Sequence, residues 1–407
     1  MRLVAARSGD ALAASAILAR ALEREGVGFQ LTLADSLTPE LADRIAAGKH
    51  AVAVAIGLGD ASADRLAPLA AGVVLVDGAH GPEDPVIAAR LTAHAGRYDA
   101  SSEASLSFLA LLLARSLAAR HLDLAPLAVA GALADRQRPL RGLNGELASE
   151  AVETGALRAT REMALDGGTM LDALAGSLDP FLPGLTGRAR AAKKLLDEAG
   201  IAPDASPRAL DVAAQERLVS LLALRRLEAG LAPDDLVATR HRGADGVAPD
   251  AAAWGLEAAA LAGRPALAFG DAAGLLAAGA ALRERVLAQA LRAERDGLLL
   301  EGAVATLAVA EGDLATSLAG VAASHLAPPG ARAALVRVRA DGGAAFVGRA
   351  TARAAPDDDL GAAFAAAAKA LGGAGGGRRG AAHAFVPEDA AHAFAGEVAK
   401  RLGGASA

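Results

Sequence analysis

Three aspartates follow predicted strands or lie in a helical turn, where their carboxylates could do chemistry. Asp10 follows the first strand-like run, Asp77 follows the fourth, and Asp135 lies in a helical turn within residues 129–137. Carboxylates that converge at strand ends hold divalent metals in hydrolases, because hard cations need several anionic oxygens. An aspartate at the start of a helix more often caps that helix, and Asp10 also fits this role.

A second candidate is the low-complexity run 372–380, which reads Gly-Gly-Ala-Gly-Gly-Gly-Arg-Arg-Gly and is predicted to be a turn. Backbone without side chains can approach phosphate closely, and successive N–H groups can form an anion-binding nest. Arg378 and Arg379 add positive charge. A flexible surface loop has the same composition, so the run alone leaves both interpretations open.

The elements that must position these residues follow an α/β pattern. Strand-like runs at 3–6, 29–33, 51–56 and 73–76 alternate with helical stretches at 10–25 and 39–47. This alternation predicts a parallel sheet with helices on its faces. Right-handed crossovers place the carboxyl ends of the strands at one edge, where open α/β sheets bind ligands.

The rest of the chain divides at segments rich in proline and glycine. Two buried helices are expected within 102–134, and the segment 178–187 interrupts the helices before a helix at 188–198. A loop at 232–250, rich in Gly, Asp and Pro, is the next predicted boundary or mobile connection. The last part contains strand-like runs at 303–310, 333–338 and 344–351. The predicted segments are 1–190, 191–250 and 251–407.

Composition excludes several classes of protein. Of the 407 residues, 53% are hydrophobic and 22% are charged, which excludes wholesale disorder. A net charge of -6 excludes a generally cationic nucleic-acid coat protein. The absence of cysteine excludes disulfides, thiolate zinc sites and a cysteine nucleophile. Without a membrane-length apolar run or a signal-peptide pattern, we expect a cytoplasmic protein with no membrane partner.

Several motifs, in order along the chain, together resemble one superfamily. The sequence at 8–14, SGDALAA, is similar to DADGLAA; VDGA at 76–79 is similar to VDHH; GALADRQ at 131–137 is similar to GxxGDxQ. Near the end, GGGRRGAAHA at 375–384 is similar to GGGHxxAAGA. The sequence thus resembles the DHH/DHHA1 phosphoesterases, within them the archaeal RecJ-like exonuclease branch with the GINS-associated nuclease and Cdc45-like proteins. Segments 141–144 and 179–187 extend the resemblance over nearly the whole chain.

The resemblance implies a fold and a cofactor. The expected fold is an N-terminal DHH domain, with a parallel sheet flanked by helices, at 1–190, a helical connector at 191–250 and a smaller C-terminal α/β DHHA1 domain at 251–407. Family members hold two manganese ions and cleave phosphodiesters. The family's ligand positions read here, in order, Ala6, Ser8, Asp10, Gly57, Asp77, Gly78, Ala79 and Asp135.

Most of the family's metal ligands are therefore missing. Two divalent ions about 3.5 to 4 Å apart repel and need bridging anions, so a two-metal site is not expected. Asp60 and His80 lie close to the lost ligands in sequence. A shifted loop would leave Asp10, Asp77, His80 and Asp135 as residual ligands of one metal, and we expect manganese to bind weakly or not at all.

The C-terminal motif departs from the family in the same direction. Arg378 stands in place of the family histidine, and His383 in place of its second glycine. Arginine suits phosphate because its planar guanidinium stays charged and donates several hydrogen bonds. Arg349 or Arg353 falls where relatives place a phosphate contact. The candidate nucleic-acid or phosphate-binding residues are Gly375, Gly376, Gly377, Arg378, Arg379, His383 and Arg349.

Three functions remain open at this stage. The first is a catalytically degenerate RecJ-like subunit that binds single-stranded nucleic acid or acts as a scaffold in archaeal DNA replication or repair, with GINS or the replicative helicase as partner. The second is a metal-dependent, single-strand-specific exonuclease or nucleotide phosphodiesterase with a rearranged site. The third is a domain whose sheet edge mediates only protein contacts, which the 2% aromatic content favours.

Other polar residues are predicted to have structural roles. Ser101, Ser102 and Ser105 precede a helix and are expected to cap it or face a cleft. Six histidines lack metal-ligand spacing, and a surface or hydrogen-bonded role is predicted for each. They are His50, His94, His121, His241, His325 and His392.

Overall fold

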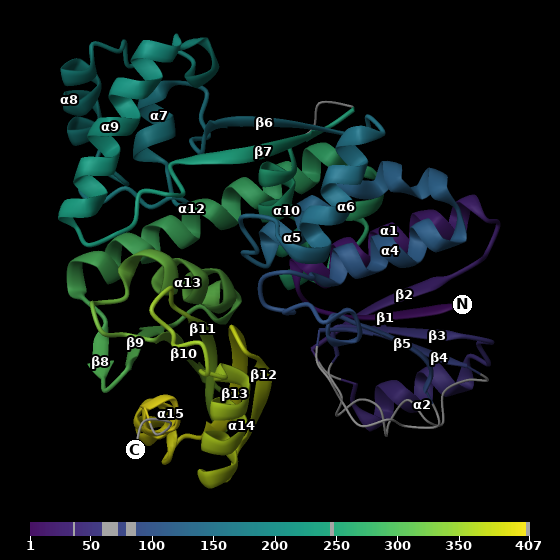
Figure 1. Ribbon diagram of the computed structural model, residues 1–407. Coiled ribbons are helices and arrows are strands. Elements are labelled where there is room, and N and C mark those ends of the chain that lie inside the picture. The colour runs from purple at the N-terminus through teal and green to yellow at the C-terminus, as the bar shows by residue number, and fades with distance from the viewer. Residues whose placement is uncertain (36, 59–71, 79–86, 245–247, 404–407) are drawn as a thin grey trace. The chain divides into compact units, whose positions relative to one another are not determined.

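The computed structural model describes residues 1–35, 37–58, 72–78, 87–244 and 248–403 (Figure 1). The chain forms two compact units. The first comprises Met1–Ala159 and His241–Arg283, and the second comprises Thr160–Arg240 and Glu284–Ala407. Within the described residues, no helix combines the length and the apolar character needed to cross a membrane.

The first unit contains a parallel five-stranded sheet in the order β2-β1-β3-β4-β5, which confirms the predicted α/β class. The four predicted strands are present within two residues of their predicted bounds. The fifth was not predicted, because Arg90 interrupts a short strand at the sheet edge. The strands are β1 Arg2–Ala6, β2 Gln30–Ala34, β3 Ala53–Ile56, β4 Val73–Asp77 and β5 Ile87–Thr92.

Alternate strand residues enter two different cores, as the period of two requires. Leu3 and Ile56 pack toward α1 and α4, whereas Val4 and Leu75 pack toward α2. Figure 1 shows α2 on the opposite face of the sheet from α1 and α4. Nearly all of α1 is buried, which explains its alanine content, because small side chains let neighbouring helices approach closely. The helices are α1 Gly9–Arg24, α2 Pro39–Ala47, α4 Leu106–Leu117, α5 Ala125–Ala134 and α6 Gly142–Glu153.

Residues 241–283 return to the first unit, so its bounds differ from the predicted segments 1–190 and 251–407. Leu256 and Ala259 pack in one core with Leu12 and Ala16 of α1. This apolar contact joins segments that are far apart in sequence, which composition shifts along the chain do not reveal. The helices within residues 241–283 are α10 Pro249–Leu261, α11 Leu267–Gly270 and the first part of α12 Ala272–Asp296.

The second unit begins with a helical cluster around Leu195 and Leu218. The predicted loop at 232–250 is wrong in part, since it contains β7, which pairs with β6. Boundary residues 159/160 and 240/241 fall within these two strands. The elements are β6 Leu157–Met163, α7 Met170–Ala175, α8 Ala189–Ala199, α9 Val212–Glu228 and β7 Val237–Gly243.

A six-stranded sheet in the order β12-β13-β11-β10-β9-β8 completes the second unit. One face carries a core in which the Phe394 ring lies 4.4 Å from that of Phe346 and 5.1 Å from that of Phe364. Its elements are β8 Leu299–Glu301, β9 Val304–Val309, α13 Ala315–Val321, a π-helical turn Ala322–Leu326, β10 Ala333–Ala340, β11 Gly343–Ala350, α14 Leu360–Ala370, β12 Ala374–Arg378, β13 Ala381–Pro387 and α15 Phe394–Gly403.

The glycine-rich run is largely an edge strand, so the prediction of a turn over 372–380 is wrong except at its ends. Two of its glycines, Gly375 and Gly377, pack closely against α14 and β13. A Cβ on Gly361 would lie 2.4 Å from the carbonyl oxygen of Gly377, and a Cβ on Gly375 would lie 2.7 Å from the Cβ of Ala384. Glycine is required here because backbone and helix approach so closely.

Candidate functional site

Asp10 caps a helix, but not its own. Ser8 is the N-cap of α1 and accepts from the Ala11 N–H at 3.3 Å, so the prediction that Asp10 caps α1 is wrong. The Asp10 carboxylate instead accepts the Leu106 N–H on Oδ2 at 2.8 Å and the Ser107 N–H on Oδ1 at 3.0 Å. Asp10 therefore binds the amino-terminal end of α4, where exposed N–H groups and the helix dipole favour an anion.

Asp135 lies close enough to Asp10 to affect its charge. Asp10 is only 3% exposed, and its burial, followed by the negative charge of Asp135, raises its pKa to about 6. The Asp135 Oδ2 accepts a hydrogen bond from Gln137 Nε2 at 2.9 Å. Two of the three predicted carboxylates, Asp10 and Asp135, thus lie close enough to interact.

A buried polar network surrounds this pair. Asn144 accepts the Ser105 N–H at 3.0 Å and donates to Gln137 Oε1 at 2.7 Å, while Gln137 also donates to the Ala100 carbonyl at 2.9 Å. Ser105 caps α4 by accepting the Phe108 N–H, as predicted. The segment 100–107 is therefore fixed in place beside the carboxylates.

Ser101 and Ser102 do not cap the helix. The Ser101 N–H donates to Asp99 Oδ1 at 2.7 Å, and the Ser102 hydroxyl donates to Asp99 Oδ2 at 3.3 Å. They help to close the turn that leads into α4. The predicted capping role holds for Ser105 alone among the three serines.

Asp77 ends β4, two strands away from β1 in the sheet order, and is 6% exposed. Its sequence neighbour Gly78 has no room for a side chain, since a Cβ there would lie 2.9 Å from the Ala100 Cβ. The predicted residual ligand His80 lies outside the described residues, as do Ala79 and Asp60.

The position of the missing third-strand carboxylate is closed by an apolar side chain. Gly57 has φ +67°, in the left-handed region that favours glycine. A Cβ at this position would lie 2.6 Å from the Leu106 Cδ1 and 3.5 Å from the Ala6 Cβ. The same helix start that binds Asp10 thus also fills the space beside Gly57.

Helix α10 adds a carboxylate that sequence reasoning missed. Glu257 is 6% exposed, and its Oε2 accepts the Gly9 N–H at 2.8 Å. The only signal in the sequence was an acidic residue within an alanine-rich helix. Asp250, at the start of the same helix, forms an ion pair with Arg138.

The second candidate site is the outer face of the strands β11, β13 and β12, which we call the outer sheet face. Arg378 and Arg349 lie in register with Ala381 from either side, and Gly376 lies in register with His383. Directly opposed residues share a face, so Arg378, His383 and Arg349 lie on the same surface. At about 4.8 Å per strand, the two arginine backbones are about 10 Å apart.

The glycines predicted to approach phosphate, Gly375, Gly376 and Gly377, lie on two different faces of the sheet. Gly375 and Gly377 are directed at α14 and at Ala382 on the core side, whereas nothing lies within 4 Å of a Cβ built on Gly376. Arg379 lies in the turn after β12, and its Nε donates to the Asp358 carbonyl at 3.2 Å. Arg353, the alternative to Arg349, donates to the Gly230 carbonyl at 3.3 Å.

An aromatic side chain on the outer sheet face was not predicted. Phe385 is 42% exposed and lies in register with Ala345 and Ala374. The alternation of buried and exposed residues along β13 places it on the same face as His383. That alternation, Ala-His-Ala-Phe-Val, was the signal that could have identified it.

A cavity of about 770 Å³ in the first unit is lined by none of the predicted site residues. It lies between the end of α1 and the segment before α12, with Arg20, Phe29 and Phe269 in its walls. The chemistry expected from the sequence is therefore not located in this cavity.

No protein-family model and no curated protein matches the sequence. Solved structures do. Cdc45 from Entamoeba histolytica matches with a TM-score of 0.65 at 13% identity, over 98% of this chain and 95% of that one. RecJ in complex with Mn²⁺ from Thermus thermophilus matches with a TM-score of 0.55 at 19% identity, over 98% of this chain and 51% of that one. The DHH domain of a member of the s1p family of ribosomal proteins matches with a TM-score of 0.54 at 15% identity, over 98% of this chain and 86% of that one.

These likenesses establish the fold. The chain has the architecture of RecJ, Cdc45 and the DHH-domain protein, with a parallel sheet flanked by helices and a second, mixed sheet. The predicted fold, and the likeness of fold to RecJ and Cdc45 that the motifs indicated, are thereby confirmed.

Proposed function

We propose that this chain, built on the fold shared by RecJ and Cdc45, is a catalytically degenerate subunit that binds single-stranded nucleic acid in archaeal DNA replication or repair. The observation that carries the proposal is the double hydrogen bond from the start of α4 to Asp10. A carboxylate at a metal-ligand position of the motif here holds a helix in place.

We infer that the described residues do not fit the manganese pair that the resemblance implies. The RecJ structure contains Mn²⁺, and two such ions need several bridging anionic oxygens. Here a Cβ on Gly57 would collide with the Leu106 side chain and a Cβ on Gly78 with Ala100, so a ligand at either position requires these neighbours to move. No hydrolytic step is therefore assigned to these residues.

Binding would use the outer sheet face. The backbones of Arg378 and Arg349 lie about 10 Å apart on this face, so each arginine can contact a different phosphate, and each planar guanidinium can donate two parallel hydrogen bonds. Phe385 offers a partly exposed ring on which a base can stack. Gly376 leaves room between them for a close approach of the strand backbone.

Single-strand binding at increasing salt tests the proposal. We expect the wild-type affinity for a labelled oligonucleotide to fall with salt, and Arg378→Ala and Arg349→Ala each to lower the salt slope by about 0.7. Lys369→Ala is the matched control, because Lys369 is exposed on α14, on the core side of the sheet. An equal loss of affinity in Arg378→Ala, Arg349→Ala and Lys369→Ala would argue against binding at the outer sheet face.

The partner is proposed on the same basis. We expect GINS or the replicative helicase to co-purify with the chain, as the resemblance to Cdc45-like proteins implies. If the purified chain bound neither GINS nor the helicase, and also failed to bind single strands at low salt, this role would be contradicted.

The alternative is a phosphodiesterase with one rearranged metal. The proximity of Asp10 and Asp135 favours it, because a cation between two buried carboxylates would relieve their repulsion. Metal-dependent release of nucleotides that is lost in Asp135→Asn would support this alternative over the degenerate subunit.

A further inference from the structure

A buried histidine in the second unit has no hydrogen-bond partner among the described residues. The side chain of His325 is only 2% exposed, and neither ring nitrogen is hydrogen-bonded within that part of the chain. This differs from the predicted surface or hydrogen-bonded role. Buried polar groups are nearly always paired, so His325 requires an explanation. It lies in the π-helical turn Ala322–Leu326, a feature often found at functional sites.

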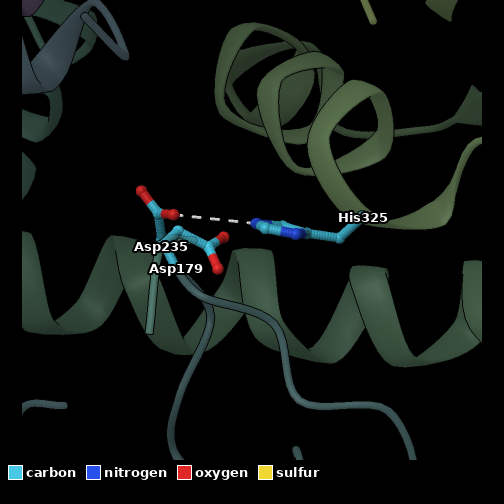
Figure 2. A group of neighbouring side chains, drawn as sticks. All are labelled: Asp179, Asp235 and His325. Atoms are coloured by element: carbon cyan, nitrogen blue, oxygen red, sulfur yellow. Dashed lines mark ion pairs between the residues drawn. The ribbon is translucent and has the colours of Figure 1, made fainter. Parts of the chain in front are cut away.

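Two carboxylates face this histidine (Figure 2). The Asp179 Oδ1 lies 3.6 Å from His325 Nε2, and one ligand atom from each of Asp179, Asp235 and His325 lies within 4.8 Å of the others. The Asp235 Oδ1 is buried and accepts no hydrogen bond from any residue that the structure describes. The side chain of Asp179 is 36% exposed, which leaves a path from solvent.

The carboxylates are held before any ligand binds. Arg226 donates to Asp235 Oδ2 at 2.9 Å and to the Phe181 carbonyl at 3.0 Å, so it ties the two carboxylate-bearing loops together. The Thr186 hydroxyl accepts the Leu182 N–H and donates to the Ser177 carbonyl, which closes the loop that carries Asp179. Such supporting contacts orient metal ligands in proteins.

The Phe181 ring fixes the imidazole from one side. Its centroid lies 6.2 Å from that of His325, with the planes inclined by 24°. The ring nitrogens are therefore directed by packing rather than by a hydrogen bond. Such an arrangement leaves a nitrogen lone pair available to a cation.

We propose that Asp179, Asp235 and His325 form a binding site for one zinc ion, which joins the loop at 179, the turn at 235 and the π-helical turn. Two carboxylate oxygens and one imidazole nitrogen are a ligand set that zinc accepts, with water as the fourth ligand. Ligand atoms about 2.1 Å from a tetrahedral metal lie about 3.4 Å apart, close to the separation of Asp179 and His325. The site is distinct from the residues of the proposed nucleic-acid function.

Calorimetric titration of the tag-free, EDTA-treated full chain with Zn²⁺ tests the site. We expect one strong site per chain, and a visible absorption spectrum of tetrahedral type when Co²⁺ replaces zinc. His325→Gln and Asp179→Asn should each weaken zinc binding by at least about tenfold, because losing even a residue that supports a ligand costs about 10- to 100-fold in metal affinity. Asp179→Asn changes a partly exposed residue, so it remains informative if His325→Gln does not fold.

Two controls separate this site from others. His392→Gln changes an exposed histidine and should leave zinc affinity unchanged. The triple variant Asp10→Asn, Asp77→Asn, Asp135→Asn removes the three carboxylates predicted as metal ligands in the first unit and should also retain the zinc site. Unchanged zinc affinity in His325→Gln and Asp179→Asn, or its loss in the triple variant, would overturn the proposal.

Discussion

At the residue scale, Asp10 is a buried carboxylate, and its surroundings only partly stabilise its negative charge. Two N–H donors from α4 favour the ionised form, but burial and Asp135 outweigh them and raise the pKa to about 6. Because this pKa lies above the unfolded value of 3.8, the protonated form stabilises the fold. That stabilisation is complete below about pH 4 and is lost as the pH rises through 6.

The variant Asp10→Asn does not titrate, so it should lose this part of the pH dependence. Relative to wild type, the free energy of unfolding of Asp10→Asn should increase by about 3 kcal/mol between pH 4 and pH 7.5, because wild type loses about 1.4 kcal/mol of stability per unit of pKa shift. Urea denaturation of both proteins across this range measures the difference. A constant difference between them would show that Asp10 keeps an ordinary pKa.

Gly57 gives a second test at this scale. Restoring the family's carboxylate with Gly57→Asp should destabilise the fold by about 2 to 5 kcal/mol, from backbone strain and from overpacking against Leu106. Gly26→Asp is the matched control, because Gly26 has φ +70° with nothing within 4 Å of a Cβ. It should cost only about 1 to 2 kcal/mol. Equal costs in denaturation would show that Leu106 does not close the site.

At the element scale, the outer sheet face combines charge with one exposed ring. Phe385→Ala should weaken single-strand binding by about 1 to 3 kcal/mol, the contribution of one stacked base, without changing the salt slope. Phe385→Tyr keeps an aromatic ring and should bind as wild type does. Fluorescence anisotropy with a labelled oligonucleotide measures both. Loss of affinity in Phe385→Tyr, or none in Phe385→Ala, would remove stacking from the account.

The same scale shows what the sequence could predict. The strands and helices up to 56 were predicted closely, because period-two and helical patterns are clear there and α2 begins with Pro39. The strand β12 was missed because glycine is rare in strands, and only the close packing of α14 explains it. The helix that Asp10 caps lies nearly 100 residues away, and local capping rules cannot reveal such a partner.

At the scale of the whole molecule, each unit is assembled from segments distant in sequence. Segment 241–283 belongs to the first unit through its packing on α1, which boundary signals along the chain cannot show. The cluster of Asp179, Asp235 and His325 likewise gathers residues up to 146 positions apart. The motifs nevertheless identified the architecture, since their order along the chain reflects the order of the elements.

The central claim is that the carboxylates of the first unit no longer support hydrolysis. The most direct measurement is the release of nucleotides from end-labelled single strands by the full chain with added Mn²⁺, in parallel with Asp77→Asn. We predict no release above background by either protein, while the wild type still binds the strand when EDTA is present. Manganese-dependent release by the wild type that disappears in Asp77→Asn would contradict the account.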